Sequence, residues 1–379
     1  MPALTKAQKK QAQAAEDSFH RTYAAQFGEE RWQQSLYPAL AAPTRYAALA
    51  NRFAVADLDK VFSQEQAAKV QAVPFPAIKE EPCDSLESAP LKAYQWDASE
   101  AETTFPPPQP DSSSGLMTHW NLDAASLLAV RVLDPAPGDK VLDLCAAPGG
   151  KSVALSQLLR PDNYTSASPS LGGGCLHSNE VNAGRNKRLA SNLQSYLPEA
   201  LFKTGEVKVL KLDGTDPFAV QTLPLGPGGY DKILLDAPCS SERHVVHAHA
   251  KARQGGRVAD EMASWRSGQA KKMAKVQVAL LMTALRAVRV GGRVLYATCS
   301  LSDDENDGVV EKGMELVQKE RKKSGIRWDF TVHRGDLAAK GLEGWAEPTK
   351  HGWLVLPDHP SGGKWGPLFF SLLEKIETS

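Results

Sequence analysis

Short apolar runs alternate with helical patterns from about residue 116 to the end of the chain. Helical spacing of apolar residues predicts helices over 152–159, 183–197 and 271–288. Strands that alternate with such helices predict a mainly parallel, doubly wound α/β sheet. The runs that predict its strands are KVLDLCA (140–146), CLHSNEV (175–181), EVKVLKLD (206–213), YDKILLDAP (230–238) and GGRVLYATCS (291–300). Two further apolar runs, GWLVLP (352–357) and GPLFFSLLEKI (366–376), predict an antiparallel pair at the edge of the sheet.

The rest of the chain divides into two further regions. Residues 1–71 carry aromatic and aliphatic side chains at roughly helical spacing, from Phe19 to Phe53, which predicts a helical N-terminal region. Residues 72–115 are rich in proline and serine and predict a partly extended connection. The main domain then covers residues 116–379, with a low-complexity surface insertion at 162–174.

Composition narrows the class of protein. Hydrophobic residues make up 42% of the 379 residues, and no run approaches the ~18 apolar residues of a membrane span. The 44 Lys and Arg residues equal the 44 Asp and Glu residues, so nucleic-acid binding would have to come from local patches. The five cysteines form no Cys-x-x-Cys pair, which disfavours both a disulfide scaffold and a structural metal.

The first predicted strand leads into a glycine-containing turn, in DLCAAPGGK (143–151). Ligands of doubly wound folds bind beyond the carboxyl ends of the strands, and Gly149 and Gly150 would let backbone amides approach one closely. The motif is neither a dinucleotide fingerprint nor a phosphate-binding loop for nucleotides. Taken alone, it fits a tight strand-to-helix turn equally well.

Carboxylates at the ends of the next strands favour a nucleoside-type cofactor. Glu180 ends the second strand, where a carboxylate can bind a ribose diol. It follows Gly149 by 31 residues, of which 13 belong to the insertion. Asp213 could accept a hydrogen bond from the amino group of an adenine. Asp236 ends the fourth strand, where the reactive part of the cofactor would lie.

Two cysteines, Cys239 and Cys299, each follow an apolar strand into a polar turn. A thiolate that adds to C6 of cytosine activates C5 toward a methyl donor, and a second acid or base assists release. A helix predicted to begin in SLSDDEN (300–306) would favour the thiolate at Cys299, and the acidic residues there would cap this helix and point away from the sulfur. The residues alone leave open which cysteine attacks. The alternative to a catalytic pair is that both cysteines are small buried side chains without a chemical role.

Three motifs together, DLCAAPGGK, DAPCSSERH (236–244) and ATCSLSDDEN (297–306), resemble those of the RNA cytosine-5 methyltransferases of the Nol/Nop/Sun family, which use S-adenosylmethionine. The resemblance covers residues 116–379, with the motifs in the family's order. The N-terminal region and ERHVVH (242–247) are similar to the branch that methylates mitochondrial small-subunit ribosomal RNA.

This resemblance implies a Rossmann-like class I S-adenosylmethionine-dependent methyltransferase with a helical N-terminal extension. It implies that Cys299 is the nucleophile and that Cys239 assists product release. Lys151 and Asp236 would also orient the cytosine. The substrate would be RNA, with ribosomal RNA in the mitochondrion favoured and the cytoplasm and nucleus left open. The implied cofactor contacts are Gly149, Gly150, Lys151, Glu180, Arg185, Asp213, Gly214 and Asp236; relatives often have Asp in place of Glu180.

A basic stretch follows Cys239 in the sequence. Between Arg243 and Lys275 there are eight Lys or Arg residues against Asp260 and Glu261, which favours phosphate contacts or, alternatively, a solvated helix face. The candidate RNA contacts are Arg243, Lys251, Arg253 and Arg257. The histidines at 244, 247 and 249 lack partners with metal-ligand spacing, so we expect no metal.

Two other functions compete with RNA methylation. No terminal RNA-binding module is evident, so specificity is left to substrate context or to a partner protein. A ribosome-assembly factor that binds RNA, with catalysis secondary, is the main alternative. Methyl transfer to protein is disfavoured, because glutamine methyltransferases carry Asn-Pro-Pro-Tyr where this chain has DAPC (236–239).

Overall fold

We describe the protein from a computed structural model. The structure describes residues 6–54, 62, 64–76, 90–97, 104–160, 170–225, 228–255, 257–335 and 341–378. Most of the predicted insertion at 162–174, and Cys83 in the predicted connection, lie outside the described residues.

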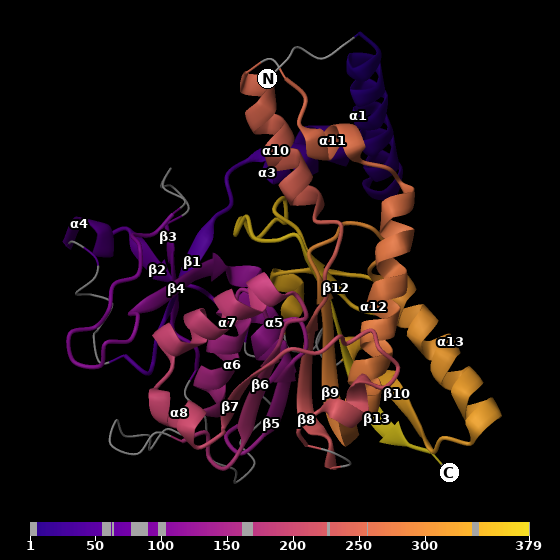
Figure 1. The fold of residues 1–379 in the computed structure, drawn as a ribbon. Helices are drawn as coiled ribbons and strands as arrows, with labels where there is room; N and C mark the ends of the chain where they lie inside the picture. The colour runs from indigo at the N-terminus through magenta and orange to yellow at the C-terminus, as the bar shows by residue number, and fades with distance from the viewer. Residues whose placement is uncertain are drawn as a thin grey trace.

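A large mixed sheet forms the centre of the molecule (Figure 1). Its strands follow the order β11-β12-β13-β9-β8-β5-β6-β7, with β10 paired to β13. All pairs from β9 to β7 are parallel, and β13 runs antiparallel to β9 and to β12, which confirms the predicted parallel sheet with an antiparallel C-terminal edge. The strands are β5 (Lys140–Asp143), β6 (Cys175–Asn179), β7 (Val207–Leu210), β8 (Tyr230–Asp236), β9 (Val288–Thr298), β10 (Trp328–Val332), β11 (Glu347–Pro348), β12 (Trp353–Val355) and β13 (Leu368–Glu377).

Helices cover both faces of this sheet. Alternate strand residues face opposite ways, so Leu234 and Leu295 belong to one hydrophobic cluster, whereas Ile233 and Val294 belong to the other. The first cluster packs against α5 (Ala124–Leu133), α6 (Gly150–Leu159) and α7 (Ala183–Tyr196), and the second against α12 (Gly268–Ala287) and α13 (Asp307–Ser324). The smaller helices of this domain are α8 (Glu199–Lys203), α9 (Ala219–Thr222) and η4 (Leu342–Gly344).

The N-terminal region is only partly helical. It begins with α1 (Lys6–Phe27), α2 (Glu29–Arg31), the π-helix η1 (Trp32–Leu36) and α3 (Tyr37–Ala41). Residues Tyr46–Ala50 then form strand β1, so the helical prediction for that stretch was wrong. Side chains 47–49 are all buried, and burial on both faces removes the alternation that marks a strand.

Strand β1 belongs to a second, four-stranded antiparallel sheet with the order β2-β3-β1-β4. This sheet lies beside α5 and α7 in Figure 1. It draws β3 from the predicted Pro/Ser-rich connection, where Trp96 stacks on Phe105 with ring centroids 5.1 Å apart. The division at residues 71 and 115 stays an interpretation of the sequence. The remaining elements are α4 (Gln64–Ala67), β2 (Val70–Ala72), β3 (Ala93–Trp96) and β4 (His119–Asp123).

Helices α1, α10 (Glu242–Gln254) and α11 (Asp260–Ser264) gather at one end of the molecule (Figure 1). Phe19 of α1 packs edge-on against Trp265, with ring centroids 5.2 Å apart, and lies 5.9 Å from Trp32. These helices therefore join the core on the α12 face of the sheet. Among the described residues, no helix is both long and apolar enough to cross a membrane.

Candidate active site

A cavity of about 270 Å³ lies beyond the carboxyl ends of β5 and β8, against strand β4 of the smaller sheet. Two candidate residues, Lys151 and Asp236, line it together with the glycine-containing turn. Its lining residues are Tyr46, Trp120, Asn121, Leu122, Asp123, Ser126, Asp143, Cys145, Ala146, Ala147, Pro148, Gly150, Lys151 and Asp236. The cavity therefore lies where the sequence placed a cofactor.

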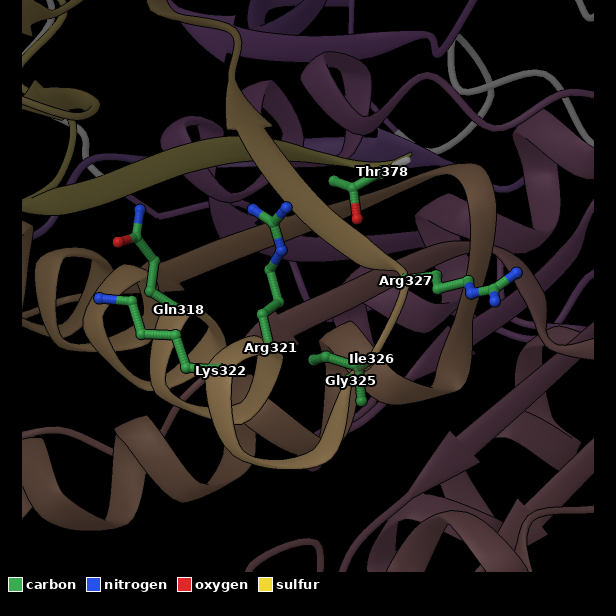
Figure 2. Close-up of a pocket in the computed structure, with 7 residues that line it drawn as sticks. All are labelled: Gln318, Arg321, Lys322, Gly325, Ile326, Arg327 and Thr378. Carbon is green, nitrogen blue, oxygen red and sulfur yellow. The ribbon is translucent and has the colours of Figure 1, made fainter.

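A larger cavity, of about 530 Å³, lies at the other end of the sheet (Figure 2). It is lined by the end of α13 and by the chain next to β10 and β13, with Arg321, Lys322 and Arg327 around it. Strand β13 is antiparallel to β9, so Thr378 lies near the start of β9 and far from Cys299 at its end. This second cavity contains none of the predicted site residues.

The two glycines of the turn are required for different reasons. Gly149 has φ +121°, a conformation that other residues rarely adopt. Gly150 begins α6, and a Cβ there would lie 2.6 Å from Trp120 Nε1. The turn can therefore approach the Trp120 indole closely, and the first two residues of α6, Gly150 and Lys151, line the cavity.

Lys151 and Asp236 form an ion pair at the base of the cavity. Lys151 Nζ lies 2.8 Å from Asp236 Oδ2 and donates a hydrogen bond to Ser126 Oγ at 2.9 Å. Burial by itself would lower the pKa of Lys151, but the charge and hydrogen bond of Asp236 raise it above its usual value. Lys151 is thus held as a cation beside Asp236, and the roles of both toward cofactor and cytosine stay predictions.

Asp143 is a cavity residue that the sequence reasoning missed. It ends β5, is 1% exposed and accepts a hydrogen bond from Ser152 Oγ at 2.7 Å. Burial raises the pKa of Asp143 to about 7. The strand-end rule that selected Glu180, Asp213 and Asp236 applies equally to Asp143, so the signal was present in the sequence.

The predicted ribose and adenine contacts lie along the neighbouring strand ends, outside the cavity lining. Glu180 is 5% exposed, and its carboxylate accepts from Asn182 N at 2.8 Å and pairs with Arg185 Nε at 3.3 Å. Arg185 also donates to the carbonyl oxygen of Ala147, at 2.9 Å, which ties it to the glycine-containing turn. Asp213 is exposed, and hydrogen bonds from Thr215 lower its pKa.

Gly214 has a packing role in the structure. A Cβ at this position would lie 2.8 Å from Leu280 Cδ2 in α12. A side chain here would displace the end of the Leu280 side chain, so packing against α12 is one reason for the glycine. Its predicted cofactor contact stays a prediction.

The two cysteines meet at the ends of the adjacent strands β8 and β9. Cys239 Sγ lies 2.9 Å from Cys299 Sγ, and Ser241 Oγ lies 3.2 Å from Cys299 Sγ and 3.4 Å from Cys239 Sγ. The hydrogen bond from Cys239 lowers the pKa of Cys299, whereas the same hydrogen bond, with burial, raises that of Cys239. These opposite directions favour Cys299 as the cysteine that ionises first, with Cys239 as the hydrogen-bond donor.

The source of this stabilisation differs from the one predicted. Helix α13 begins only at Asp307, so no helix N-terminus follows Cys299 directly. Glu305 is fully buried and does not cap a helix. Asn306 accepts a hydrogen bond from Thr298 Oγ1 at 2.7 Å. The pattern SLSDDEN was misread as a helix start because its Ser and Asp residues form turns equally well.

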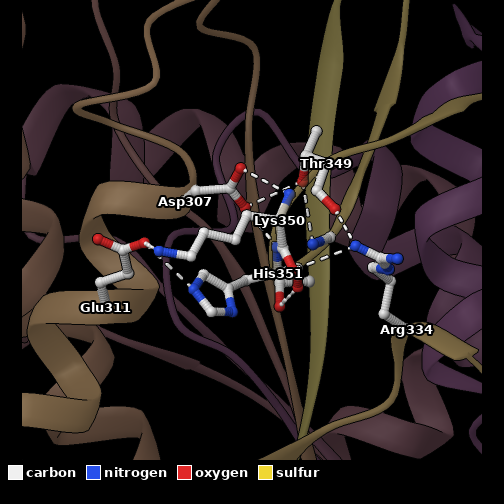
Figure 3. Close-up of polar contacts among 8 residues, drawn as sticks. Asp307, Glu311, Arg334, Thr349, Lys350 and His351 are labelled. Carbon is white, nitrogen blue, oxygen red and sulfur yellow. Dashed lines mark hydrogen bonds and ion pairs between the residues drawn. The ribbon is translucent and has the colours of Figure 1, made fainter.

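Asp307 instead fixes the start of α13 to the turn between β11 and β12 (Figure 3). Its carboxylate accepts hydrogen bonds from Thr349 Oγ1, at 2.9 Å, and from the backbone nitrogen of His351, at 2.8 Å. Glu311, one turn further along α13, pairs with Lys350 at 2.5 Å. These contacts lie on the side of α13 that faces the C-terminal strands.

The four candidate RNA contacts divide into two kinds. Lys251, Arg253 and Arg257 are exposed, although Arg253 also pairs with Glu16 at 3.0 Å. Arg243 is mostly buried: its guanidinium donates to the carbonyl oxygen of Gly366 and lies 3.9 Å from Asp123 Oδ2. An RNA phosphate at Arg243 would have to compete with these contacts.

The histidines near Cys239 form no metal site within the described residues. His249 is fully buried, with Nε2 3.2 Å from Glu16 Oε1, and His247 Nε2 contacts the carbonyl oxygen of Ala42 at 2.8 Å. The part of the chain that the structure describes contains no group of three or more potential metal ligands.

Comparison with known proteins agrees with this geometry. A family model described as 16S rRNA methyltransferase RsmB/F matches residues 130–329. The chain is 32% identical over 326 residues to a protein of Mus musculus named 5-cytosine rRNA methyltransferase NSUN4, covering 83% of this chain and 77% of that protein. It is 31% identical over 380 residues to a Danio rerio protein named tRNA (cytosine(34)-C(5))-methyltransferase, mitochondrial, covering 98% and 90%.

Solved structures show the same fold. NSun6 from Pyrococcus horikoshii, determined with SFG, matches with a TM-score of 0.61 at 16% identity, over 95% of this chain and 98% of that one. A methyltransferase homologue from the same organism matches with a TM-score of 0.58 at 18% identity, over 98% and 99%. The matched residues 130–329 contain the cavity turn, the Lys151–Asp236 ion pair and both cysteines. The chain therefore belongs to the RsmB/F family of rRNA methyltransferases.

Proposed function

We propose that this protein transfers a methyl group from S-adenosylmethionine to C5 of cytosine in RNA, with Cys299 as the nucleophile. The observation that carries this proposal is the contact between Cys239 Sγ and Cys299 Sγ, 2.9 Å apart at strand ends that adjoin the cofactor cavity. A reaction that needs a thiolate beside a second thiol uses both groups. The named relatives, which act on cytosine C5 in rRNA or tRNA, support the same reaction.

The residues of the cavity fit S-adenosylmethionine. A small residue is required at Gly150, where a Cβ would meet Trp120, and the amides at the start of α6 suit a carboxylate. Asp236 and Asp143 supply acceptors inside the cavity, while Glu180, Arg185 and Asp213 would hold the nucleoside end along the neighbouring strands. When bound, the cofactor supplies an electrophilic methyl group on a sulfonium.

The chain's own residues carry the remaining chemistry. The Cys299 thiolate forms a bond to C6 of the cytosine, and the electron pair of the C5–C6 double bond becomes available at C5 to take the methyl group. A proton acceptor then removes the C5 proton, the C5–C6 double bond re-forms, and the bond from sulfur to C6 breaks. The Cys239 thiol donates a hydrogen bond to the departing Cys299 sulfur, which assists its release as a thiolate. Lys151 and Asp236 orient the target cytosine beside the cysteines.

Ribosomal RNA in the mitochondrion is the substrate and compartment that we propose. Relatives named as rRNA methyltransferases support the substrate, and those named as mitochondrial tRNA methyltransferases support the compartment. The exposed cations Lys251, Arg253 and Arg257 on and after α10 would contact phosphates near the target base. A partner protein would supply the remaining RNA specificity.

The test compares three cysteine variants in a methyl-transfer assay on ribosomal RNA. Cys299→Ala should abolish transfer, because no thiolate can add to C6, whereas S-adenosylmethionine should still bind. Cys239→Ala should accumulate a covalent protein–RNA adduct that survives denaturing electrophoresis. Cys175→Ala, at the start of β6, is the matched control and should leave turnover unchanged. Near-normal turnover by Cys299→Ala would refute the assigned role.

Bisulfite mapping then identifies the RNA. Loss of the gene should remove a 5-methylcytosine from ribosomal RNA. If the lost 5-methylcytosine lies in tRNA instead, the proposed reaction still holds, but the substrate is tRNA and not ribosomal RNA. The assembly-factor alternative predicts that the Cys299→Ala protein restores normal ribosome assembly in cells that lack the gene.

A further inference from the structure

The serines that follow the two cysteines repeat the contact that the cysteines make. Ser240 Oγ lies 3.0 Å from Ser300 Oγ, just as the two sulfurs lie 2.9 Å apart. The two loops are therefore in register over two residues each. Something must hold them there, because loops after strand ends have no ladder of backbone hydrogen bonds.

Two buried carboxylates join the loops reciprocally. Glu305, which follows Cys299 in the sequence, accepts a hydrogen bond from the backbone nitrogen of Ser240 at 3.0 Å. Glu242, which follows Cys239, accepts one from the backbone nitrogen of Leu301 at 2.9 Å. Each carboxylate thus comes from one cysteine loop and binds the backbone of the other.

The remaining contacts of these carboxylates are also to neutral groups. Both contact Ser240 Oγ, and Glu305 accepts from Ser300 Oγ at 3.0 Å and from Gln277 Nε2 at 2.7 Å. Glu242 and Glu305 are both fully buried, and within the described residues neither forms an ion pair with Lys or Arg. The single hydroxyl proton of Ser240 can serve only one of them.

Two buried acids this close favour a state in which one of them keeps its proton. Burial, together with the charge of Glu242, raises the pKa of Glu305. The two carboxyl groups thus bridge the loops beside a pair of sulfurs whose own protonation decides reactivity.

Helix α1 completes the network from the far end of the sequence. Tyr23 is 2% exposed and donates a hydrogen bond from its hydroxyl to Glu242 Oε1 at 2.8 Å. One turn further, Gln26 Nε2 donates to the carbonyl oxygen of Leu301 at 2.6 Å and to Asp303 Oδ1 at 2.9 Å. The N-terminal helix therefore touches the loops of both cysteines.

We propose that Glu242, Glu305 and Tyr23 are positioning residues that hold Cys239 against Cys299, which makes α1 part of the catalytic centre. They act through the cysteines and touch neither cofactor nor base. The inference rests on the proposed roles of the two cysteines. This positioning role explains why helix α1, which lies outside the methyltransferase sheet, packs against α11 and the loops beyond β8 and β9.

The test measures the reactivity of Cys299 directly. Iodoacetamide alkylation of Cys299 is followed by peptide mass spectrometry over a range of pH, in the full-length protein without RNA. If Glu242 acts only through its negative charge, Glu242→Gln should lower the pKa of Cys299, because that charge raises it. Positioning predicts the opposite sign: the contact with Cys239 loosens, and the pKa of Cys299 rises toward the ordinary thiol value of about 8.5.

Turnover gives the second measurement. Glu242→Gln and Glu305→Gln should each lower kcat roughly 10- to 100-fold with little change in KM, as expected for loss of a hydrogen bond to a charged group. Tyr23→Phe removes one hydroxyl from a side chain that stays packed against Phe19 and Trp32, and should lower kcat roughly 3- to 10-fold. Tyr23→Phe also guards against a glutamate variant that fails to fold.

Glu311→Gln is the matched control, because Glu311 lies on α13 but pairs with Lys350 away from the cysteines (Figure 3). It should change neither the alkylation profile nor kcat. The proposal is overturned if the alkylation profile stays in place, or shifts to lower pH, in Glu242→Gln and Tyr23→Phe. Because alkylation needs no RNA, it separates failure of this proposal from failure of the substrate assignment.

Discussion

The two halves of the catalytic centre are stabilised by different physical means. On the cofactor side, an ion pair between Lys151 and Asp236 lies beside the buried carboxyl group of Asp143. On the cysteine side, Glu242 and Glu305 have neutral partners only, in the part of the chain that the structure describes. The cofactor side thus holds a charged pair, whereas the cysteine side relies on hydrogen bonds from neutral donors to carboxylates.

The halves also differ in which part of the N-terminal region contributes to them. The cofactor cavity is lined by Tyr46 of β1, by β4 and the start of α5, by segment 143–151 and by Asp236. The cysteine side combines three segments, around residues 23–26, 239–242 and 299–305. We expect the cofactor side to survive small rearrangements of the loops, and the cysteine side to be sensitive to the N-terminal helix.

The largest effect should come from removing the cation on the cofactor side. Lys151→Met leaves the Asp236 carboxylate without its partner and removes the cation that orients the cytosine, so turnover should fall roughly 100- to 1000-fold. Methyl transfer and binding of S-adenosylmethionine should both fall, and calorimetry measures the latter. The alkylation profile of Cys299 should shift to higher pH, because the Lys151 cation and the Cys299 thiolate attract each other.

Arg289→Met is the matched control for this variant. It breaks the Arg289–Asp231 ion pair, which lies at the opposite end of the same strand and is more exposed. An effect below about 1 kcal/mol is expected for such a surface pair. Equal losses in the two variants would mean that the cofactor side has no special electrostatic role.

A smaller effect, on stability, should follow from Asp143. The unfolded chain loses this proton near pH 4, whereas the folded protein holds it to about pH 7. Between these values the folded state binds more protons, so its stability should fall as pH rises, by a few kcal/mol at most. Asp143→Asn should remove this slope, as measured by urea unfolding of both proteins from pH 4.5 to 7.5. If the free energy of unfolding changed with pH in the same way in both proteins, the raised pKa of Asp143 would be contradicted.

The smallest effect should come from the exposed cations after Cys239. Lys251→Ala and Arg257→Ala should raise KM for RNA a few-fold and reduce the salt dependence of binding by about one phosphate contact each, with kcat unchanged. Lys319→Ala, on the exposed end of α13 away from the cysteines, should change neither quantity. If all three variants behave alike, the basic stretch is only a solvated surface.

Local patterns explain what could be predicted. The strands, the glycine-containing turn and the meeting of Cys239 with Cys299 follow from residues close in sequence and from the rule that parallel strands end at one edge. Asp143 obeys the same rule and could have been included. The prediction of a helix over residues 46–50 failed because a strand buried on both faces shows no alternation.

Long-range contacts explain what could not be predicted. Glu242 and Glu305 look like surface residues in the sequence, since nothing nearby shows that Ser240 and Leu301 will meet them in the interior. Tyr23 and Glu242 are 219 positions apart. Nor does the sequence show that Arg243 turns toward Gly366 and Asp123 rather than toward solvent.

Strand β13 has a consequence for biosynthesis. It is the last strand of the described chain, yet it pairs with β9 on one side and with β12 and β10 on the other. Until the ribosome has released it, the growing polypeptide exposes an unpaired apolar border along β9, the kind of surface that recruits other chains. Nascent molecules stalled before residue 368 should therefore depend on chaperones to stay in solution.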